Sequence, residues 1–354
     1  NTNTISGSGT SSVTLDASSL SGIATLYLDA TNNGVANVKT GSAADIITID
    51  GVTTDAAGYI IETNGAADTI NITTNGDGAT AVIDIDGGAE TDILILDAGV
   101  DLSLSTLGLT SVETIQLTGG GTSQKIAASD ISGVNLTLSE SGAGTAVLTI
   151  VADQATINLS NLSLDNSFAV GTDSILVDAS GAASGVTITG TSGDDTITGS
   201  NADDTISGGD ATDTISGGTG DDIIDGGNGA DILTGGAGDD EFDFTAGSST
   251  EAEMDSITDF QADVEDEHND TIDNITGTVG ADTSNVDVKS AILGGSGSET
   301  VNASVSSGIV TLSGTDVGSI DSLAEWIDAV SVDGVIALAA DDEDSTGTVA
   351  FQFN

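Results

Sequence analysis

The chain of 354 residues contains no cysteine, no proline and no arginine, and only three basic residues, Lys39, Lys125 and Lys289. The absence of cysteine excludes a disulfide framework and thiol chemistry. A formal net charge of −54 excludes nucleic acid as a partner, because phosphate contacts require lysine and arginine. No apolar run reaches the length of about 18 residues that a membrane-spanning helix needs, so we expect no membrane insertion.

The composition that remains predicts a folded chain that binds cations. The 57 acidic residues would destabilise a compact state by self-repulsion unless cations neutralised them. High charge with few aromatic residues is also typical of disorder. However, 37% of the residues are hydrophobic, and they fall in short runs of the strand-forming residues Ile, Leu, Val and Thr. Disorder therefore stays an alternative only for a cation-free state.

Six uninterrupted nonapeptides occupy residues 190–243. Their sequences are GTSGDDTIT, GSNADDTIS, GGDATDTIS, GGTGDDIID, GGNGADILT and GGAGDDEFD. The sixth place is always aspartate: Asp195, Asp204, Asp213, Asp222, Asp231 and Asp240. The eighth place is always a large apolar residue: Ile197, Ile206, Ile215, Ile224, Leu233 and Phe242. Such a fixed period indicates a repeat architecture in which each unit stacks on the next.

A longer repeat precedes the nonapeptides. One series of apolar strand centres runs through Leu26, Ile47, Ile70, Leu94, Ile115, Leu136 and Ile157. A second series runs through Leu15, Val38, Ile60, Ile83, Leu104, Ile126 and Leu148. Two short strands in each repeat of about 22 residues are typical of a flattened solenoid coil. We therefore expect one continuous solenoid, with wide coils over residues 1–189 and narrower coils over 190–243.

The last part of the chain lacks this periodicity. Residues 244–280 form an acidic connecting segment, and 281–354 predict a small α+β cap. Its expected strands are 308–312, 335–338 and 348–353. A helix over 322–330 is predicted from the capping box of Ser322 and Glu325 and from an apolar stripe that includes Trp326. The predicted fold class is all-β, a parallel β-solenoid or β-roll with a small C-terminal α+β cap.

The nonapeptide turns have the chemistry of calcium ligands, because calcium prefers six to eight oxygen atoms in a flexible arrangement. Stacked coils place Asp195, Asp213 and Asp231 on one edge and Asp204, Asp222 and Asp240 on the other. Across a strand spacing of about 5 Å these carboxylates would repel one another unless an ion lay between them. Three upstream turns resemble degenerate versions of the motif and contain Asp45, Asp68 and Asp92. Either calcium binding or ordinary Gly-Asp turn chemistry explains those three.

The nonapeptides resemble the calcium-binding β-roll of repeats-in-toxin (RTX) proteins. This resemblance implies that each ion lies between two stacked turns and takes backbone carbonyls and both sixth-place carboxylates. The ligands implied for the first ion are Thr191, Gly193 and Asp195 from one turn and Gly208, Asp210 and Asp213 from the next. The departures from the motif are Ala202 and Ala211 at the fourth place and Thr191 and Ser200 at the second. Backbone carbonyls tolerate these departures, but we expect the second and third turns to bind calcium more weakly.

Segments on both sides of the nonapeptides resemble parts of type I secreted bacterial proteins. Residues 255–260, which follow the repeats, resemble a segment typical of such chains. Residues 305–354 resemble their C-terminal caps, including those of surface-layer proteins, and 109–120 resemble surface-layer solenoids. The resemblance implies type I secretion and a place outside a bacterium or on its surface, with a cell-surface glycan as a candidate anchor.

The sequence predicts a structural protein and no enzyme. Neither an HExxH zinc motif nor a GxSxG nucleophile elbow occurs. The one histidine, His268, lies in an acidic segment, which predicts a solvent-exposed loop. We expect a calcium-dependent, self-assembling extracellular protein, a surface-layer or filament subunit whose partner is the chain itself. The alternative is an adhesin or ice-binding spacer that presents a ligand site. Repeated outward threonines would favour ice binding, and the sequence shows no array sustained over all the coils.

Overall fold

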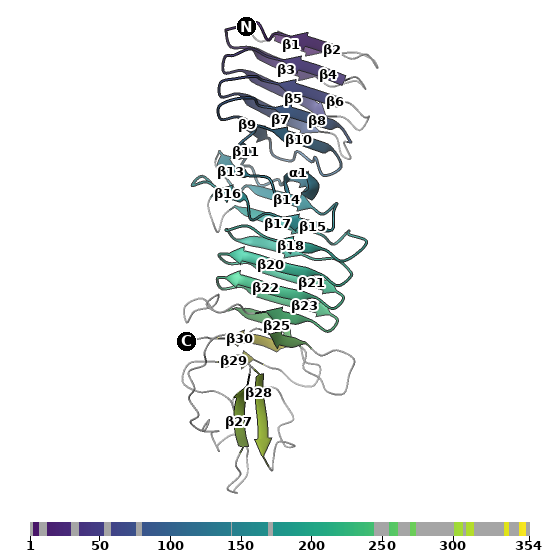
Figure 1. Cartoon of the computed structure of the whole chain (residues 1–354), viewed down its shortest axis with the longest axis vertical. Coiled ribbons are helices and arrows are strands. Elements are labelled where there is room, and N and C mark those ends of the chain that lie inside the picture. Colours follow the sequence, from purple (N-terminus) through teal and green to yellow (C-terminus); the bar gives the residue numbers. More distant parts are fainter. Residues whose placement is uncertain are drawn as a thin grey trace. The chain divides into compact units, whose positions relative to one another are not determined.

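The computed structural model describes residues 3–6, 13–29, 35–52, 58–75, 80–142, 144–168, 173–243, 255–260, 270–273, 301–306, 309–314, 336–339 and 347–351. The chain divides into two compact units, Asn1–Ala179 and Ser180–Asn354. Within each unit, short strands stack in parallel sheets (Figure 1). The predicted fold class, an all-β parallel solenoid, is confirmed.

The first unit is built from two facing series of strands. One parallel sheet, here called the first sheet, has the order β1 (Asn3–Ser6), β3 (Thr25–Asp29), β5 (Ile46–Val52), β7 (Thr69–Asn75), β9 (Ile93–Leu96), β11 (Thr114–Thr118), β13 (Leu136–Ser141) and β16 (Leu162–Leu164). The second sheet contains β2 (Val13–Asp16), β4 (Val35–Lys39), β6 (Gly58–Glu62), β8 (Val82–Asp86) and β10 (Thr106–Thr110). The remaining strands are β12 (Gln124–Ala127), β14 (Val147–Val151), β15 (Thr156–Asn158) and β17 (Ser174–Asp178).

Register pairing confirms most of the first predicted series. Leu26, Ile47, Ile70, Leu94 and Ile115 form one column, and all five are buried. Because alternate residues of a strand point to the same face, residues paired in register across successive strands all point inward, and this column is part of the core. The last two predicted members were wrong. The column continues through Leu138 in place of Leu136, and Ile157 lies in β15, outside the first sheet.

The second series starts in register, because Leu15 pairs with Val38, but this column continues through Ile61 and Ile85 in place of Ile60 and Ile83. Ile126 and Leu148 lie in a different sheet. Ile60 is 41% exposed, while its neighbours Tyr59 and Ile61 are buried. Leu104 is 65% exposed and precedes β10. The β6 sequence Gly-Tyr-Ile-Ile-Glu places apolar residues on both faces, so periodicity alone does not fix which residue points inward. A shift of one residue moves a side chain to the opposite face.

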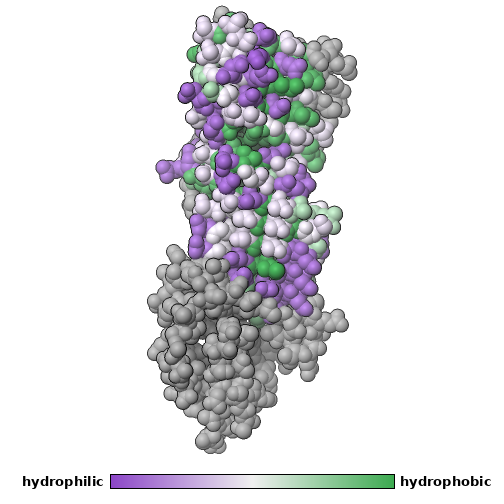
Figure 2. All heavy atoms as spheres, viewed as in Figure 1, coloured by the Kyte–Doolittle hydropathy of each residue, from purple (hydrophilic) through white to green (hydrophobic). Residues whose placement is uncertain are grey.

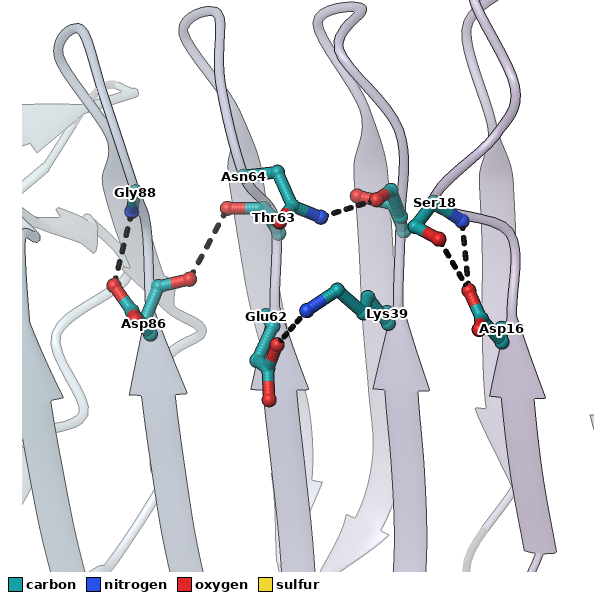
Figure 3. Close-up of polar contacts among 9 residues, drawn as sticks. Asp16, Ser18, Lys39, Glu62, Thr63, Asn64, Asp86 and Gly88 are labelled. Atoms are coloured by element: carbon teal, nitrogen blue, oxygen red, sulfur yellow. Dashed lines mark hydrogen bonds and ion pairs between the residues drawn. The ribbon is translucent and has the colours of Figure 1, made fainter.

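A short helix and one polar ladder complete the first unit. Helix α1 (Ala128–Ile131) follows β12 and is not predicted by the sequence. The second sheet carries in-register polar residues at its strand ends, where Lys39 pairs with Asp16 on one side and Glu62 on the other. Lys39 forms an ion pair with Glu62 (Figure 3). Positive charge thus interrupts a row of carboxylates at this point.

The second unit has narrower coils. One parallel series is β18 (Thr187–Thr189), β20 (Thr205–Asp210), β22 (Ile223–Asn228), β24 (Glu241–Asp243) and β26 (Thr271–Asp273). The other is β19 (Asp195–Thr198), β21 (Thr214–Thr219), β23 (Ile232–Ala237) and β25 (Ser256–Phe260). The predicted eighth-place residues all lie in the core with at most 1% exposure. Phe242 also packs against Phe260, with ring centroids 6.3 Å apart.

Antiparallel strands follow the parallel stack. Strand β30 (Gly347–Phe351) pairs with β25 and with β29 (Ile336–Ala339). A hairpin joins β27 (Val301–Ser306) and β28 (Ile309–Gly314). The three strands expected in the C-terminal cap are therefore present, and β27 is an addition. The helix predicted over 322–330 lies outside the described residues, as does His268.

A pair of substitutions in β6 tests the register. Ile61 is fully buried and Ile60 is 41% exposed. Ile61→Ala should lower the free energy of unfolding by about 2–5 kcal/mol because it leaves a cavity, whereas Ile60→Ala should change it by less than about 0.5 kcal/mol. Urea denaturation in excess calcium measures both. Equal losses in the two variants would contradict the register.

Candidate metal centre

The sixth-place aspartates of the nonapeptides are buried. Asp195, Asp204, Asp213, Asp222, Asp231 and Asp240 are all at most 2% exposed. A buried carboxylate is costly unless it is paired, hydrogen-bonded or bound to a metal. The surroundings of these side chains therefore decide what the turns can do.

One oxygen of each inner carboxylate holds the coils together. The backbone N–H of Asp195 donates to Asp213 Oδ1 at 2.8 Å, and the N–H of Asp213 donates to Asp231 Oδ1 at 2.8 Å. On the opposite edge Asp204 N donates to Asp222 Oδ1 at 2.8 Å and Asp222 N donates to Asp240 Oδ1 at 3.0 Å. We call these two columns the aspartate ladders. Each rung joins residues 18 positions apart, which is the spacing the sequence predicts.

The other carboxylate oxygen has no protein partner in four of these residues. Asp195 Oδ1 and the Oδ2 atoms of Asp213, Asp222 and Asp231 are buried without a hydrogen bond. Burial raises the pKa of Asp213 to about 8 and those of Asp195 and Asp222 to about 7, against backbone hydrogen bonds that lower them. Neighbouring aspartates raise these pKa values further. These oxygens are suited to a cation, which would replace the missing partner and offset the repulsion.

The first place of each turn keeps the space beside the unpaired oxygen open. A Cβ atom on Gly208 would lie 2.2 Å from Asp213 Oδ2 and 2.5 Å from the carbonyl oxygen of Gly226. Glycine is therefore required here, and it leaves a carboxylate oxygen and a carbonyl oxygen of successive coils close together. Hard oxygens of this kind are the ligands that calcium prefers. The residues present thus fit calcium.

The backbone has to supply much of the coordination. Within the described ranges, no group of three or more His, Cys, Asp or Glu side chains is placed to hold a metal ion. Two aspartates per site neutralise a divalent cation, and carbonyl oxygens have to complete the shell. This agrees with the ligands that the RTX resemblance implies.

Comparison with protein families identifies the repeats. Residues 187–215, 207–242 and 216–250 match the family model of the RTX calcium-binding nonapeptide repeat, which describes four copies. The second unit contains an RTX β-roll. RTX nonapeptide repeats bind Ca²⁺, so the predicted cofactor is confirmed. No curated protein and no solved structure matches the chain.

The family match also indicates the cellular location that is typical of proteins with these repeats. Proteins with RTX repeats are typically exported by type I secretion and are extracellular. No enzyme family matches the chain. In the part of the chain that the structure describes, no helix is long and apolar enough to cross a membrane.

The β-roll brings the predicted first site together. Thr191, Gly193, Asp195, Gly208 and Asp213 are all buried. The side chain of Asp210 is exposed and accepts a hydrogen bond from Asn228 Nδ2 at 2.7 Å, so only its backbone carbonyl is available as the predicted ligand. Asp204, Asp222, Asp231 and Asp240 occupy the equivalent ladder positions. All of these remain the predicted calcium ligands.

The first two RTX turns differ from the later ones. Thr191 Oγ1 donates to Asp195 Oδ2 at 3.0 Å, and Ser200 Oγ donates to Asp204 Oδ1 at 2.9 Å. The backbone N–H of Ser200 donates to Asp204 Oδ2 at 2.6 Å, so both oxygens of Asp204 are already hydrogen-bonded. A cation has to compete with these donors. This competition agrees with the weaker binding expected at the second turn, which contains Ser200, and it applies equally to the first turn, for which weaker binding was not expected.

The aspartate ladders extend beyond the nonapeptides. Asp231 N donates to Asp255 Oδ1 at 3.0 Å, and Asp240 N donates to Asp270 Oδ1 at 3.1 Å. Both added carboxylates are buried. These two residues were not predicted as ladder members from the sequence. The signal was present, because Asp255-Ser256-Ile257 and Asp270-Thr271-Ile272 repeat the Asp-x-apolar pattern of the sixth to eighth places.

The first unit carries a ladder of its own. Asp45 N donates to Asp68 Oδ1 at 2.6 Å and Asp68 N donates to Asp92 Oδ1 at 2.7 Å. Asp92 N in turn donates to Glu113 Oε2 at 2.9 Å. The structure therefore places all three predicted upstream aspartates in one column, and each is at most 1% exposed. Residues 187–250, which the family model matches, do not include them.

Substitution of one ladder aspartate should weaken calcium binding. Asp222→Asn keeps an oxygen that can accept the Asp204 N–H bond but removes the charge from two predicted ion sites. We expect the calcium concentration at half-saturation to rise by about tenfold or more, since affinity depends on ligand charge. Asp221→Asn is the matched control, because Asp221 is exposed and adjacent. Calorimetric titration measures both, and equal affinities in the two variants would contradict the assignment.

The calcium-free β-roll should lose stability as pH rises. Asp195, Asp213 and Asp222 have folded-state pKa values of about 7 to 8, against about 4 in an unfolded chain. Between these values the folded state binds more protons, so its stability is greatest below about pH 4 and falls through pH 8. Urea midpoints of protein freed of calcium by dialysis should be higher at pH 5 than at pH 8. A midpoint that rises over this range would refute the prediction.

Proposed function

We propose that this chain is a calcium-dependent structural subunit that self-assembles outside a bacterium, as a surface layer or filament, after type I secretion. In this proposal its role is structural and not catalytic. The observation that carries the proposal is an uncharged face on a highly acidic protein.

The uncharged face consists of two columns of residues on the outer surface of the first sheet. Asp50 lies at the edge of these columns, where its carboxylate accepts hydrogen bonds from Tyr27 and Thr73. Its first column contains Thr25, Ile46, Thr69, Ile93, Thr114 and Thr137, in register from β3 to β13. Its second column contains Tyr27, Thr48, Asn71, Ile95 and Gln116. None of these side chains is charged. They are only partly covered, and Ile46 is 40% exposed.

The second sheet of the same unit differs. Asp16, Lys39, Glu62 and Asp86 form one in-register row, part of which is visible in Figure 3. Asp84 is exposed beside exposed apolar residues such as Ile60 and Val82. Figure 2 shows hydrophobic side chains in green among hydrophilic ones in purple on the face it presents. Apolar exposure alone therefore does not distinguish the two sheets, whereas charge does.

Charge favours a second copy of the chain as the occupant of the uncharged face. Two copies with a net charge of −54 each repel over the Debye length, which is about 8 Å at physiological salt. Contact is least unfavourable where neither surface carries charge, and bound calcium lowers the remaining repulsion. The face is also repetitive, because its columns stack in register, and a self-complementary contact uses the same patch on both copies.

Calcium would then control both folding and assembly. Metal binding and folding are coupled when the site exists only in the folded state, and the aspartate ladders create such sites. Calcium is scarce inside cells and abundant outside. The chain would therefore fold and associate after export, with a cell-surface glycan as a candidate anchor.

One feature of the same face supports the second candidate, an adhesin or ice-binding spacer. Threonine occupies the first column at Thr25, Thr69, Thr114 and Thr137, interrupted by Ile46 and Ile93. The sequence analysis found no threonine array sustained over all the coils, and the register reveals this interrupted one. A regular flat face could bind a repetitive ligand in place of another subunit.

Calcium should induce association through the uncharged face. Light scattering should rise during calcium titration and stay flat with sodium at equal ionic strength, because bridging needs a divalent ion. Placing charges on the face with Ile46→Asp and Ile93→Asp should prevent association or raise the calcium needed by about tenfold, since like charges at a contact are unfavourable. Ile60→Asp with Val82→Asp, on the second sheet, is the matched control.

The outcomes separate the two candidates. A wild-type chain that stays monomeric at millimolar calcium and high protein concentration would contradict self-assembly. Inhibition of ice recrystallisation by that monomer, abolished by the Ile46 and Ile93 substitutions, would support the ice-binding spacer. Loss of association in the control pair as well would show that added net charge prevents association wherever it is placed, and that the uncharged face is not the contact.

A further inference from the structure

One turn of the first unit makes the same contacts with the following coil as an RTX turn. Turn 87–92 begins with a glycine and ends with an aspartate, as places one to six of the nonapeptide do. The N–H of Gly87 donates to the carbonyl of Thr110 in the following coil at 2.9 Å. In the β-roll the first-place Gly199 donates in the same way to the carbonyl of Ser216 at 2.8 Å. Turn 87–92 therefore stacks on the next coil as the RTX turns do.

The space beside Gly87 has the same two oxygen neighbours as in the β-roll. A Cβ atom on Gly87 would lie 2.1 Å from the carbonyl oxygen of Ser111 in the following coil and 2.5 Å from Asp92 Oδ2. Gly208 has the same neighbours, namely a carbonyl oxygen of the following coil and the Oδ2 atom of its own aspartate. Two oxygens that approach one point so closely can share a cation at calcium–oxygen distances of about 2.3–2.6 Å.

Asp92 presents an unpaired oxygen to this space. Its side chain is fully buried. The Oδ1 atom accepts the N–H of Asp68 at 2.7 Å, whereas the Oδ2 atom is buried without a hydrogen bond. Burial raises the pKa of Asp92 to about 6, against a backbone hydrogen bond that lowers it, and neighbouring carboxylates such as Glu113 raise it further. A cation would supply the missing partner of Oδ2 and offset this repulsion.

Glu113 takes the place of a ladder aspartate in the following coil. The N–H of Asp92 donates to Glu113 Oε2 at 2.9 Å, as the N–H of one ladder aspartate donates to the next in the β-roll. Only Val112 separates Ser111 from Glu113, whereas four residues separate the first and sixth places of a nonapeptide. Glutamate is one methylene longer than aspartate, so its carboxylate can reach the ladder from this shorter turn. Glu113 is exposed, so water can complete the shell of an ion beside it.

We propose that a calcium ion binds between turn 87–92 and residues 111–113, held by the carboxylates of Asp92 and Glu113 and by the carbonyl oxygen of Ser111. The two carboxylates neutralise a divalent cation, and all three ligands are the hard oxygens that calcium prefers. The site lies outside residues 187–250, the part matched by the RTX model. Its carboxylates are 21 positions apart, whereas those of the β-roll are 18 apart. The shorter second turn offers fewer carbonyls, so this ion binds more weakly than those of the β-roll.

The unpaired oxygen by itself does not define the site. Turn 63–68 ends at Asp68, whose Oδ2 atom is also buried without a hydrogen bond, but it begins with Thr63. The Thr63 hydroxyl donates to the carbonyl of Gly87 at 2.7 Å, and this carbonyl corresponds to the serine carbonyl of the proposed site. A threonine side chain thus fills the space that a glycine leaves open. The turn that ends at Asp45 also begins with a threonine, so the proposed site requires both the glycine and the aspartate.

The number of calcium ions bound per full-length chain tests the site. The double variant Asp92→Asn, Glu113→Gln, freed of calcium and reloaded, should hold one ion fewer than the wild type in native mass spectrometry. Asparagine and glutamine keep oxygens that can accept the ladder hydrogen bonds, so circular dichroism should stay unchanged. The matched control is Asp84→Asn with Glu90→Gln, because both residues are exposed and the pair removes the same charges.

The ion count decides the proposal in either direction. The control pair should hold as many ions as the wild type. An equal count in the Asp92, Glu113 double variant and the wild type would overturn the proposal, as would the loss of an ion in the control pair. The count is taken on monomers, so it does not depend on whether the chain self-assembles.

Hydrogen exchange provides a local measurement that leaves the buried aspartate unchanged. In the wild type, calcium should slow amide exchange in residues 87–92. In Glu113→Gln the calcium concentration needed for this protection should rise at least tenfold, since affinity depends on ligand charge, while protection of 208–240 persists. Glu90→Gln removes the same charge from an exposed glutamate of the same turn and should change neither. Protection of 87–92 at the same calcium concentration in Glu113→Gln and the wild type would refute the site.

Discussion

Repulsion between buried aspartates is the constraint on which the rest of this structure depends. Each ladder places carboxylates in successive coils, out of contact with water, and the Oδ2 atoms of Asp213, Asp222 and Asp231 have no hydrogen bond to protein. The apolar core offers little compensation, because each half-coil of the β-roll contributes one eighth-place residue such as Ile215 or Ile224. RTX repeats bind Ca²⁺, and an ion at the ladders would supply the missing charge, which would couple metal binding to folding.

The same constraint explains the sequence of the turns. Glycine is needed at Gly208 because a Cβ would occupy the space beside Asp213 Oδ2. Where Thr191 and Ser200 replace glycine at the second place, their hydroxyls donate to the aspartate that would otherwise face the ion. Side-chain hydrogen bonds and metal coordination are thus alternative ways to satisfy the same carboxylate. The early turns of the β-roll combine the two, and the later turns depend on the ion.

Charge is distributed unevenly over the first unit, and this affects how copies of the chain can meet. The second sheet carries the row that includes Asp16, Glu62 and Asp86, and one lysine, Lys39, interrupts it. The first sheet presents two columns of threonine, isoleucine, tyrosine and amide side chains without charge, bordered by Asp50. In a chain with so few basic residues, attraction between copies has to come from shared cations or from an uncharged surface. The proposed assembly uses both.

The fold class, the RTX repeats and their aspartate and apolar columns follow from the sequence alone, because each repeat imposes the same local turn and strand on the next. The sequence does not define the facing of Ile60 and Ile61, since both are apolar and adjacent. The Asp-x-apolar pattern at Asp255 and Asp270 is visible in the sequence, but the interruption of the nine-residue period after residue 243 leaves their place on the ladders to the tertiary structure. The tertiary structure alone shows that turns 63–68 and 87–92 share the left-handed second and fourth residues of the RTX turns from Gly208 onward, which turn 40–45 and the first two RTX turns lack. That difference depends on φ angles at Asn64, Ala66 and Glu90, which stacking against neighbouring coils imposes on residues that do not prefer them.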